Sequence, residues 1–231
     1  MCSRICGPKM NNVCVLIPSY NEARSIGAIV REVKAQGLTA YVVDDGSTDD
    51  TAAIALAEGA IVLKNEKNMG KGAALRKGFS SILKDGFDAV IIIDGDGQHE
   101  VSSLPDFIKR MEASDSDIVI GNRMTDTRSM PYVRRNTNYF MSYIISKISG
   151  QDVPDTQCGY RLIKRNVLEA VKLDSSNFEI ESELIIKAGR KGFKIASVPI
   201  KTVYRDEKSR INPIIDTLRF MAFIIRIGLK K

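Results

Sequence analysis

Two short polar segments stand directly after apolar runs and combine side chains that suit a nucleoside. Pro18-Ser-Tyr-Asn-Glu22 follows the first run, and Asp44-Asp-Gly-Ser-Thr-Asp49 follows the second. A carboxylate can accept from a base N–H or a ribose hydroxyl, an aromatic ring can cover the base, and glycine allows close backbone approach. Ordinary turns, with Ser47 or Thr48 capping the next helix, would explain either segment alone. Their occurrence after adjacent predicted strands favours a nucleotide site.

A third segment, Asp94-Gly-Asp-Gly-Gln-His99, has two carboxylates one residue apart and an amide two residues further on. Asp94, Asp96 and Gln98 offer hard oxygen ligands, which suit Mg²⁺ or Mn²⁺ bridging a diphosphate. The remaining ligand spacing and the terminal Glu of a calcium loop are absent. His99, the single histidine, is a candidate metal or phosphate ligand, and a surface or capping role is equally open.

Arginines in the second half of the chain suit a phosphate-bearing acceptor. A guanidinium binds phosphate through two parallel hydrogen bonds. A phosphate monoester, with a second pKa near ~6, is already largely ionised at neutral pH and needs orientation more than deprotonation. The candidates are Arg123, Arg134, Arg135, Arg161 and Arg205, for which a solvated basic face is the alternative.

A hydroxyl acceptor would instead need a general base. Glu181, Glu183 and Asp155 are the candidates for that role. Glu179 alternates with Glu181 and Glu183 at a predicted helix start, where the helix dipole favours acidic residues whatever the chemistry. Both interpretations of these glutamates stay open.

Apolar runs of four to six residues alternate with segments of helical periodicity, which predicts parallel strands joined by crossover helices. The expected strands are Val13–Ile17, Ala40–Val43, Ala60–Leu63, Ala89–Ile93 and Asp117–Ile120. The expected helices are Ala23–Gln36, Thr51–Glu58, Lys71–Lys84 and Ser103–Glu112. Ligands of an open α/β sheet gather at the carboxyl ends of its strands, where the acidic segments lie.

The second half is less regular. A polar stretch, Asn122–Arg135, leads into a helical pattern at Tyr139–Ile148, and Asp152–Gly159 is predicted to be a loop. Helical periods return at Val167–Leu173 and Glu181–Arg190, Lys194–Pro199 is a predicted short strand, and Pro213–Lys231 is a predicted basic amphipathic helix. That last helix either docks on the core or lies in a membrane surface.

Composition indicates a globular α/β protein with an uneven charge. The 231 residues are 44% hydrophobic and 27% charged, and the net charge is +6. Residues 201–231 hold eight basic and three acidic side chains, so the first 200 residues carry 26 against 25. This near-neutral body argues against a nucleic-acid partner and points to a membrane-surface role for the basic end. Neither a Gly-x-Gly-x-x-Gly nor a P-loop pattern is present, which disfavours a dinucleotide redox cofactor.

The cysteines and the apolar runs favour a reducing, cytoplasmic setting. Four scattered cysteines do not make a disulfide framework, and Cys2 and Cys6 have no further ligands at metal-site spacing. No apolar run approaches the ~20 residues of a spanning helix. We expect a flexible leader over residues 1–9 and one domain over residues 10–212.

In order and position, the motifs resemble those of the family 2 glycosyltransferases of the GT-A fold. The likeness rests on the three acidic segments, Asn68-Met-Gly-Lys-Gly72, Gly121-Asn-Arg123, Asp155-Thr-Gln-Cys-Gly-Tyr-Arg161 and Val198-Pro-Ile200 with Arg205. It covers about residues 10–212. Within the family, the chain is similar to the branch that glycosylates polyprenyl phosphates, such as dolichol-phosphate mannosyltransferases.

The resemblance implies a role for individual residues. Pro18, Tyr20, Glu22, Val43 and Asp45 would hold the nucleoside, and Asp94, Gly95, Asp96 and Gln98 the metal and donor diphosphate. Arg123, Arg134, Arg135, Arg205 and Arg210 would contact the acceptor phosphate. Asp96, Arg123, Asp155, Glu183 and Arg205 form the expected catalytic set.

The predicted reaction is an inverting, Mg²⁺- or Mn²⁺-dependent transfer of a hexose, mannose or glucose, from a GDP- or UDP-linked donor. The acceptor would be a dolichyl or undecaprenyl phosphate at the cytoplasmic face of a membrane. One alternative is a family 2 enzyme that glycosylates a saccharide hydroxyl in polysaccharide synthesis. A sugar nucleotidyltransferase is disfavoured because no triphosphate loop is evident, and a non-catalytic nucleotide-binding membrane scaffold is the alternative from another class.

Overall fold

The computed structural model describes residues 12–128, 130–201, 220 and 222–227. A seven-stranded sheet runs in the order β3-β2-β1-β4-β6-β5-β7. Its strands are β1 (Val13–Ser19), β2 (Thr39–Asp44), β3 (Ile61–Lys64), β4 (Ala89–Ile92), β5 (Ile118–Asn122), β6 (Arg161–Lys164) and β7 (Ile195–Pro199). All neighbours pair in parallel except β6, which is antiparallel to β4 and β5. The predicted α/β class with a mostly parallel sheet is confirmed.

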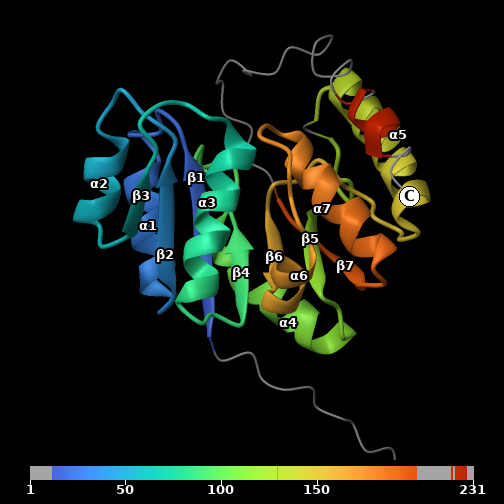
Figure 1. Cartoon of the computed structure of the whole chain (residues 1–231), viewed down its shortest axis with the longest axis horizontal. Helices are drawn as coiled ribbons and strands as arrows, with labels where there is room; N and C mark the ends of the chain where they lie inside the picture. The colour runs from blue at the N-terminus through green and yellow to red at the C-terminus, as the bar shows by residue number, and fades with distance from the viewer. Residues whose placement is uncertain (1–11, 129, 202–219, 221, 228–231) are drawn as a thin grey trace, which may run out of the picture.

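Helices cover both faces of the sheet (Figure 1). They are α1 (Ile26–Ala35), α2 (Thr51–Ala57), α3 (Lys71–Lys84), α4 (Leu104–Ser114), α5 (Tyr132–Ser149), α6 (Arg165–Ala170) and α7 (Glu179–Arg190), with a 3-10 turn η1 at Val101–Ser103. Helices α3, α6 and α7 lie on one face, α1 and α4 lie on the other, and α5 packs on the outside of α7.

The central strands are apolar throughout because both of their faces are covered. All four residues of β4 and the first five of β1 are buried, as expected for parallel strands between two helical layers. Gly78 lets α3 approach β1 closely, since a Cβ at this position would lie 2.4 Å from Leu16 Cδ1. The core therefore fixes α3, and with it the amino end of that helix, against the sheet.

The first five strands and first four helices lie close to their predicted positions, and the loop at 152–159 is also confirmed. In the second half three predictions were inaccurate. Helix α5 begins at Tyr132, after Pro131 at its N-cap, seven residues earlier than predicted. Helix α6 ends at Ala170, before the predicted Leu173. Strand β6 was not predicted at all.

The two ends of the chain are described only in part. The predicted leader lies outside the described residues, as does most of the predicted helix 213–231. Residues 220 and 222–227 are helical. Phe220, Phe223 and Ile227 are buried in the core, and Arg190 Nη1 donates to the Ile227 carbonyl at 2.9 Å. This described part is docked on the protein.

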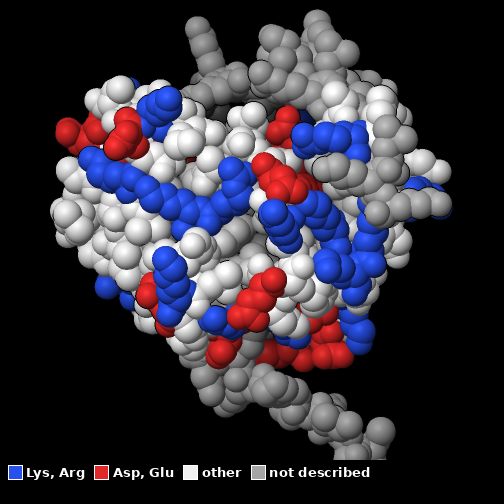
Figure 2. All heavy atoms as spheres, viewed as in Figure 1, with Lys and Arg blue, Asp and Glu red and all other residues white. Residues whose placement is uncertain are grey.

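On the face of the molecule in Figure 2, Lys and Arg side chains are intermixed with Asp and Glu. That distribution matches a near-neutral body better than a basic nucleic-acid surface. Within the described residues, every helix is too short or too polar to cross a lipid bilayer.

Candidate active site

The sheet topology brings the sequence motifs to one edge. Strand β1 lies between β2 and β4, so the segments after these three parallel strands meet at their carboxyl ends. Strand β6 runs the other way, and Arg161 at its start pairs with Ile92 of β4 and Ile120 of β5. The loop that precedes β6 therefore lies at the same edge. Strands β2 and β4 lie on opposite sides of β1, so the strand order reverses at this point. A ligand crevice is expected at such a reversal in an open α/β sheet.

The segments after β1 and β2 are bonded to each other. Asp45 N donates to the Ser19 carbonyl at 2.9 Å, and Asn21 N donates to Ser47 Oγ at 2.9 Å. Thr48 N donates to Asn21 Oδ1 at 2.8 Å. Asn21 adopts a left-handed φ of 57°, which asparagine tolerates better than most residues. The expected nucleoside-binding segments are thus neighbours in one rigid turn system.

The expected nucleoside residues differ in accessibility. Pro18, near the end of β1, and Tyr20 and Glu22, which follow β1, are half-buried, whereas Val43 is buried within β2. Asp45 is also buried, and its carboxylate accepts from Met69 N, Gly70 N and Asn65 Nδ2 at 2.7–3.1 Å. Asp45 therefore also fixes the segment that leads into α3.

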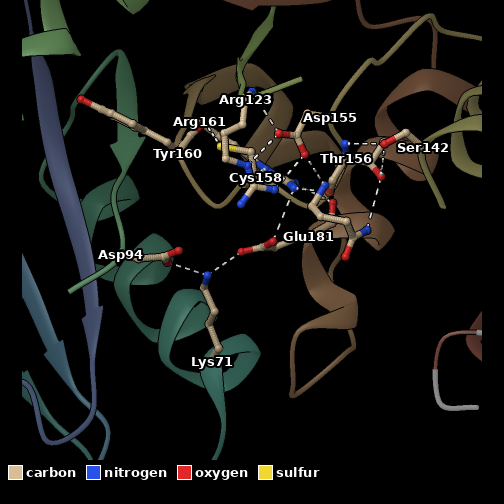
Figure 3. Close-up of polar contacts among 11 residues, drawn as sticks. Lys71, Asp94, Arg123, Ser142, Asp155, Thr156, Cys158, Tyr160, Arg161 and Glu181 are labelled. Atoms are coloured by element: carbon tan, nitrogen blue, oxygen red, sulfur yellow. Dashed lines mark hydrogen bonds and ion pairs between the residues drawn. The ribbon is translucent and has the colours of Figure 1, made fainter. Parts of the chain in front are cut away.

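Lys71, the first residue of α3, joins two carboxylates from different parts of the chain (Figure 3). Its Nζ lies 2.5 Å from Asp94 Oδ1 and 2.6 Å from Glu181 Oε1. Arg161 Nη2 lies 3.5 Å from the other oxygen of Glu181. Negative and positive charges alternate along the row Asp94, Lys71, Glu181 and Arg161, so each carboxylate has a cationic neighbour.

The contact between Lys71 and Asp94 favours the ionised form of both groups. Burial alone would raise the pKa of the Asp94 carboxyl, but Lys71, with His99 and Arg123, lowers it below its usual value. Burial would likewise lower the pKa of the Lys71 ammonium, but Asp94 and Glu181 raise it above its usual value. Asp94 is thus a carboxylate that already faces a cation.

The loop after β4 is shaped by glycines. A Cβ at Gly95 would lie 2.6 Å from Ser19 Oγ, and one at Gly159 would lie 2.4 Å from Asp94 Oδ2. Ser25 Oγ donates to the Gly95 carbonyl at 2.6 Å, and Gln98 N donates to Asp96 Oδ1 at 2.9 Å. Asp94, Asp96 and Gln98 are half-buried on this loop.

The oxygen chemistry of this loop fits a divalent cation. Asp94 and Asp96 supply two carboxylates and Gln98 an amide oxygen, which suits a magnesium-like ion that keeps water or phosphate oxygens in its remaining positions. The Lys71 ammonium against Asp94 shows that one of these carboxylates is aimed at positive charge. Within the described residues, no three His, Cys, Asp or Glu side chains form a metal cluster by themselves.

Arg123 and Asp155 form a buried bidentate pair. Arg123 Nε and Nη2 donate to the two Asp155 oxygens at 2.7 and 2.9 Å, and the Arg123 backbone N–H adds a third bond at 3.1 Å. The residues are 6% and 1% exposed. The structure thus brings together two members of the expected catalytic set.

Arg161 is almost fully buried and anchors backbone rather than facing a ligand. It donates to the carbonyls of Cys158, Thr156 and Glu181 at 2.6–2.8 Å. These bonds tie the loop before β6 to the start of α7. A solvated basic face, the alternative for the arginines, is wrong for Arg161.

His99 packs inside the protein. Its ring is 7% exposed and lies 5.4 Å from the Tyr160 ring, centroid to centroid. Burial lowers the pKa of His99 to about 4, so the ring is neutral at pH 7. The surface role considered for His99 is therefore wrong. Its Nδ1 has no hydrogen-bond partner among the described residues.

Glu183 lies in a separate set of contacts. Its carboxylate accepts from Asp174 N and Ser175 N at 2.8–3.1 Å, and Lys187 Nζ lies 2.6 Å away. Glu183 is 3% exposed. It thereby fixes residues 174–175, whose carbonyls accept from Arg76. The structure does not join Glu183 to the row formed by Asp94, Lys71 and Glu181.

Of the remaining predicted phosphate contacts, two lie on α5 and two are not described. Arg134 and Arg135 are half-buried in the first turn of α5, with Arg135 Cζ 5.1 Å from the Tyr132 ring centroid. Arg205 and Arg210 lie outside the described residues, so their roles stay predictions.

Sequence reasoning missed Lys71 and placed Glu181 only among possible bases. The signal for Lys71 was present, because it lies inside Asn68-Met-Gly-Lys-Gly72, a motif quoted for the family likeness without a role for its lysine. Its partners are 23 and 110 residues away in the sequence. Only the fold shows that this lysine meets the carboxylate after β4.

Comparison with known proteins agrees with this arrangement. The family model described as Glycosyl transferase family 2 matches residues 14–172. The chain belongs to this family. It is 30% identical to a polyprenol monophosphomannose synthase of Mycolicibacterium smegmatis, over 83% of this chain and 77% of that protein. It is 27% identical to a dolichyl-phosphate hexose transferase of Haloferax volcanii, over 96% of both chains.

Solved structures support the fold. The glucosyl-3-phosphoglycerate synthase of Mycobacterium tuberculosis, in complex with Mn²⁺, UDP and glucosyl-3-phosphoglycerate, is similar with a TM-score of 0.71 at 20% identity. The alignment covers 95% of this chain and 79% of that one. The predicted GT-A glycosyltransferase fold is confirmed.

Proposed function

We propose that this family 2 glycosyltransferase moves a hexose from a nucleotide sugar to a polyprenyl phosphate, with inversion at the anomeric carbon. The relatives named for dolichyl-phosphate and polyprenol-phosphate products support the acceptor class. Inversion rests on the family resemblance. The donor base, guanine or uracil, and the choice of mannose or glucose belong to the same proposal.

One observation carries the choice of a phosphate acceptor over a hydroxyl. Each of the three carboxylates considered as a general base is held by a cation: Asp155 by Arg123, Glu181 by Lys71, and Glu183 by Lys187. These cations occupy carboxylate oxygens that a general base would have to turn toward an acceptor hydroxyl. An acceptor that arrives ionised needs no base, because its oxygen is already a nucleophile.

In this proposal, separate groups of residues bind the nucleoside and the metal. The turns after β1 and β2 hold the nucleoside, with Tyr20 and Glu22 accessible beside buried Asp45. Asp94, Asp96 and Gln98 would hold Mg²⁺ or Mn²⁺ against the donor diphosphate. When bound, such an ion supplies positive charge to the departing nucleoside diphosphate.

Lys71 would orient Asp94 within this loop and hold the Glu181 carboxylate in place. Asp155 holds the Arg123 guanidinium in one orientation at the end of β5. Arg123, together with Arg134, Arg135, Arg205 and Arg210, would bind and orient the acceptor phosphate. The expected site is the cytoplasmic face of a membrane, where such lipid phosphates are reached by a peripheral enzyme.

The test is a matrix of GDP- and UDP-sugars against short polyprenyl phosphates and the matching polyprenols, with products identified by mass. We expect glycosyl phosphates only, dependent on Mg²⁺ or Mn²⁺ and abolished by Asp96→Ala. Glu112→Ala, which removes an exposed carboxylate on α4, is the matched control. Transfer to a polyprenol or saccharide hydroxyl, or full activity of Asp96→Ala, would contradict the proposal. Absence of turnover with every donor would favour the scaffold alternative.

A further inference from the structure

Helix α5 buries polar side chains on its inner face beside apolar ones, since Ile145 is fully buried and Met141 and Ile148 pack against the core. Asn138, Ser142 and Ser149 are buried on its inner face, 4–5% exposed. Ser142 Oγ accepts from Thr156 N at 3.0 Å, so part of this inner face is bonded to the loop before β6. A surface helix normally buries its apolar stripe and exposes the polar one.

The outer face of α5 is aromatic and apolar. Half of the large hydrophobic side chains that are exposed within the described residues lie on this one helix. They are Tyr132, Val133, Tyr139, Phe140 and Tyr143, each between 51% and 69% exposed. Positions 132, 139 and 143 follow helical spacing and share a face. We call these five side chains the α5 aromatic face.

The charge on this helix has one sign. Residues 132–149 contain Arg134, Arg135 and Lys147 and no Asp or Glu. Arg135 Cζ lies 5.1 Å from the Tyr132 ring centroid, and Lys147 Nζ lies 5.7 Å from that of Tyr143. Cations thus border the aromatic face at both ends. A face of tyrosine and phenylalanine rings bordered by basic groups is complementary to anionic lipid headgroups above an acyl layer.

From this charge and these exposed rings we propose that the α5 aromatic face docks on an anionic lipid bilayer. The choice of a bilayer rests in part on the proposed function, since a lipid-linked acceptor requires one. In Figure 1, α5 lies at the periphery, outside α7 and away from the sheet. Residues 123–131 alone separate α5 from the end of β5, so docking would place Arg123 and the acceptor site close to the headgroups.

A tryptophan reporter tests contact directly, because the chain contains no tryptophan. Tyr143→Trp places an indole on the α5 aromatic face, and Leu56→Trp places one on α2 at nearly the same exposure, 64% against 63%. With vesicles of phosphatidylcholine and phosphatidylglycerol, we expect a blue shift and quenching by brominated lipid for Tyr143→Trp only. Equal responses from both variants, or none from Tyr143→Trp, would overturn the proposal.

A second measurement compares binding of the full chain to the same vesicles by flotation. The variant Tyr139→Ser, Phe140→Ser, Tyr143→Ser should bind about tenfold or more weakly. The control Leu56→Ser, Ile61→Ser should bind as the wild type does. Pure phosphatidylcholine vesicles should bind the wild type less well than the anionic mixture. Unchanged binding by the triple variant would refute the assignment.

Two further readouts separate this proposal from its rivals. If sedimentation shows a dimer that the triple variant converts to a monomer, with vesicle binding intact, the face joins two copies of the chain and the proposal fails. Transfer to a short, water-soluble polyprenyl phosphate should be equal in wild type and triple variant, because none of the three side chains belongs to the proposed site. Loss of docking with intact transfer supports the proposal, whereas absent transfer in the wild type contradicts only the proposed function.

Discussion

Replacing Glu183 by glutamine distinguishes a base from a structural carboxylate. The Glu183 side chain is 4% exposed, lies 2.6 Å from Lys187 Nζ, and accepts from two backbone N–H groups. Glutamine keeps a neutral acceptor but loses the charge and presents an amide to Lys187. Because hydrogen bonds to charged groups contribute roughly 1.5–3 kcal/mol against about 1 kcal/mol for neutral ones, we expect Glu183→Gln to lose about 2–3 kcal/mol of unfolding free energy at pH 7.

The loss should depend on pH in a defined direction. Although burial opposes it, bonds from Lys187, Ser175 and Asp174 lower the pKa of Glu183 below its usual value. A carboxyl with a lowered pKa stabilises the fold above its unfolded pKa, and this contribution is lost as pH falls through the folded value. The difference between wild type and Glu183→Gln should therefore be full at pH 7 and shrink below about pH 4.5.

Urea unfolding at several pH values measures this difference, and sugar transfer is measured on the same samples. The matched control, Glu179→Gln, alters a half-buried carboxylate in the first turn of the same helix and should change stability by less than about 0.5 kcal/mol. We expect Glu183→Gln to retain transfer at temperatures where it is folded. A variant as stable as the wild type but inactive would refute the reasoning, because that is the signature of a catalytic base.

Two further predictions concern other buried groups. Lys71→Met should lower the free energy of unfolding by about 2–4 kcal/mol, because Asp94 and Glu181 lose the cation that they share. Added Mn²⁺ should raise the melting temperature of this variant more than that of the wild type. Equal shifts in melting temperature would count against Lys71 as the cation that faces Asp94. Burial raises the pKa of Cys14 and of Cys158 to about 12. Neither thiol should therefore react with iodoacetamide at pH 8 until urea is added, which peptide mass spectrometry can follow. Rapid labelling of these two cysteines in the folded protein would contradict their burial.

The first half of the fold could be predicted because its signals are local. Runs such as Val13–Ile17 are apolar on both faces, and such runs arise where parallel strands are covered by two layers of helices. Strand β6 could not be predicted in this way. It has four residues, and its first, Arg161, is charged yet buried. Only its non-local pairing with β4 and β5 makes it a strand.

The same distinction applies to the site. The acidic segments were found because each lies directly after a strand, so position in the sequence implied position in the fold. The partners of these residues were not found. Arg123 meets Asp155 across 32 residues, and Lys71 meets Asp94 and Glu181 through contacts that no local pattern encodes. Sequence motifs therefore predicted which segments meet at this edge of the sheet, but not the side-chain contacts between them.

The antiparallel strand explains why the acceptor side depends on the fold. A parallel strand in the place of β6 would put residues 155–160 at the opposite edge of the sheet, away from Asp94. Because β6 is reversed, these residues enter beside the carboxyl ends of β4 and β5. Thr156 then bonds to the inner face of α5, and Asp155 fixes Arg123. One loop thus links the proposed phosphate site to the helix proposed to dock on the bilayer.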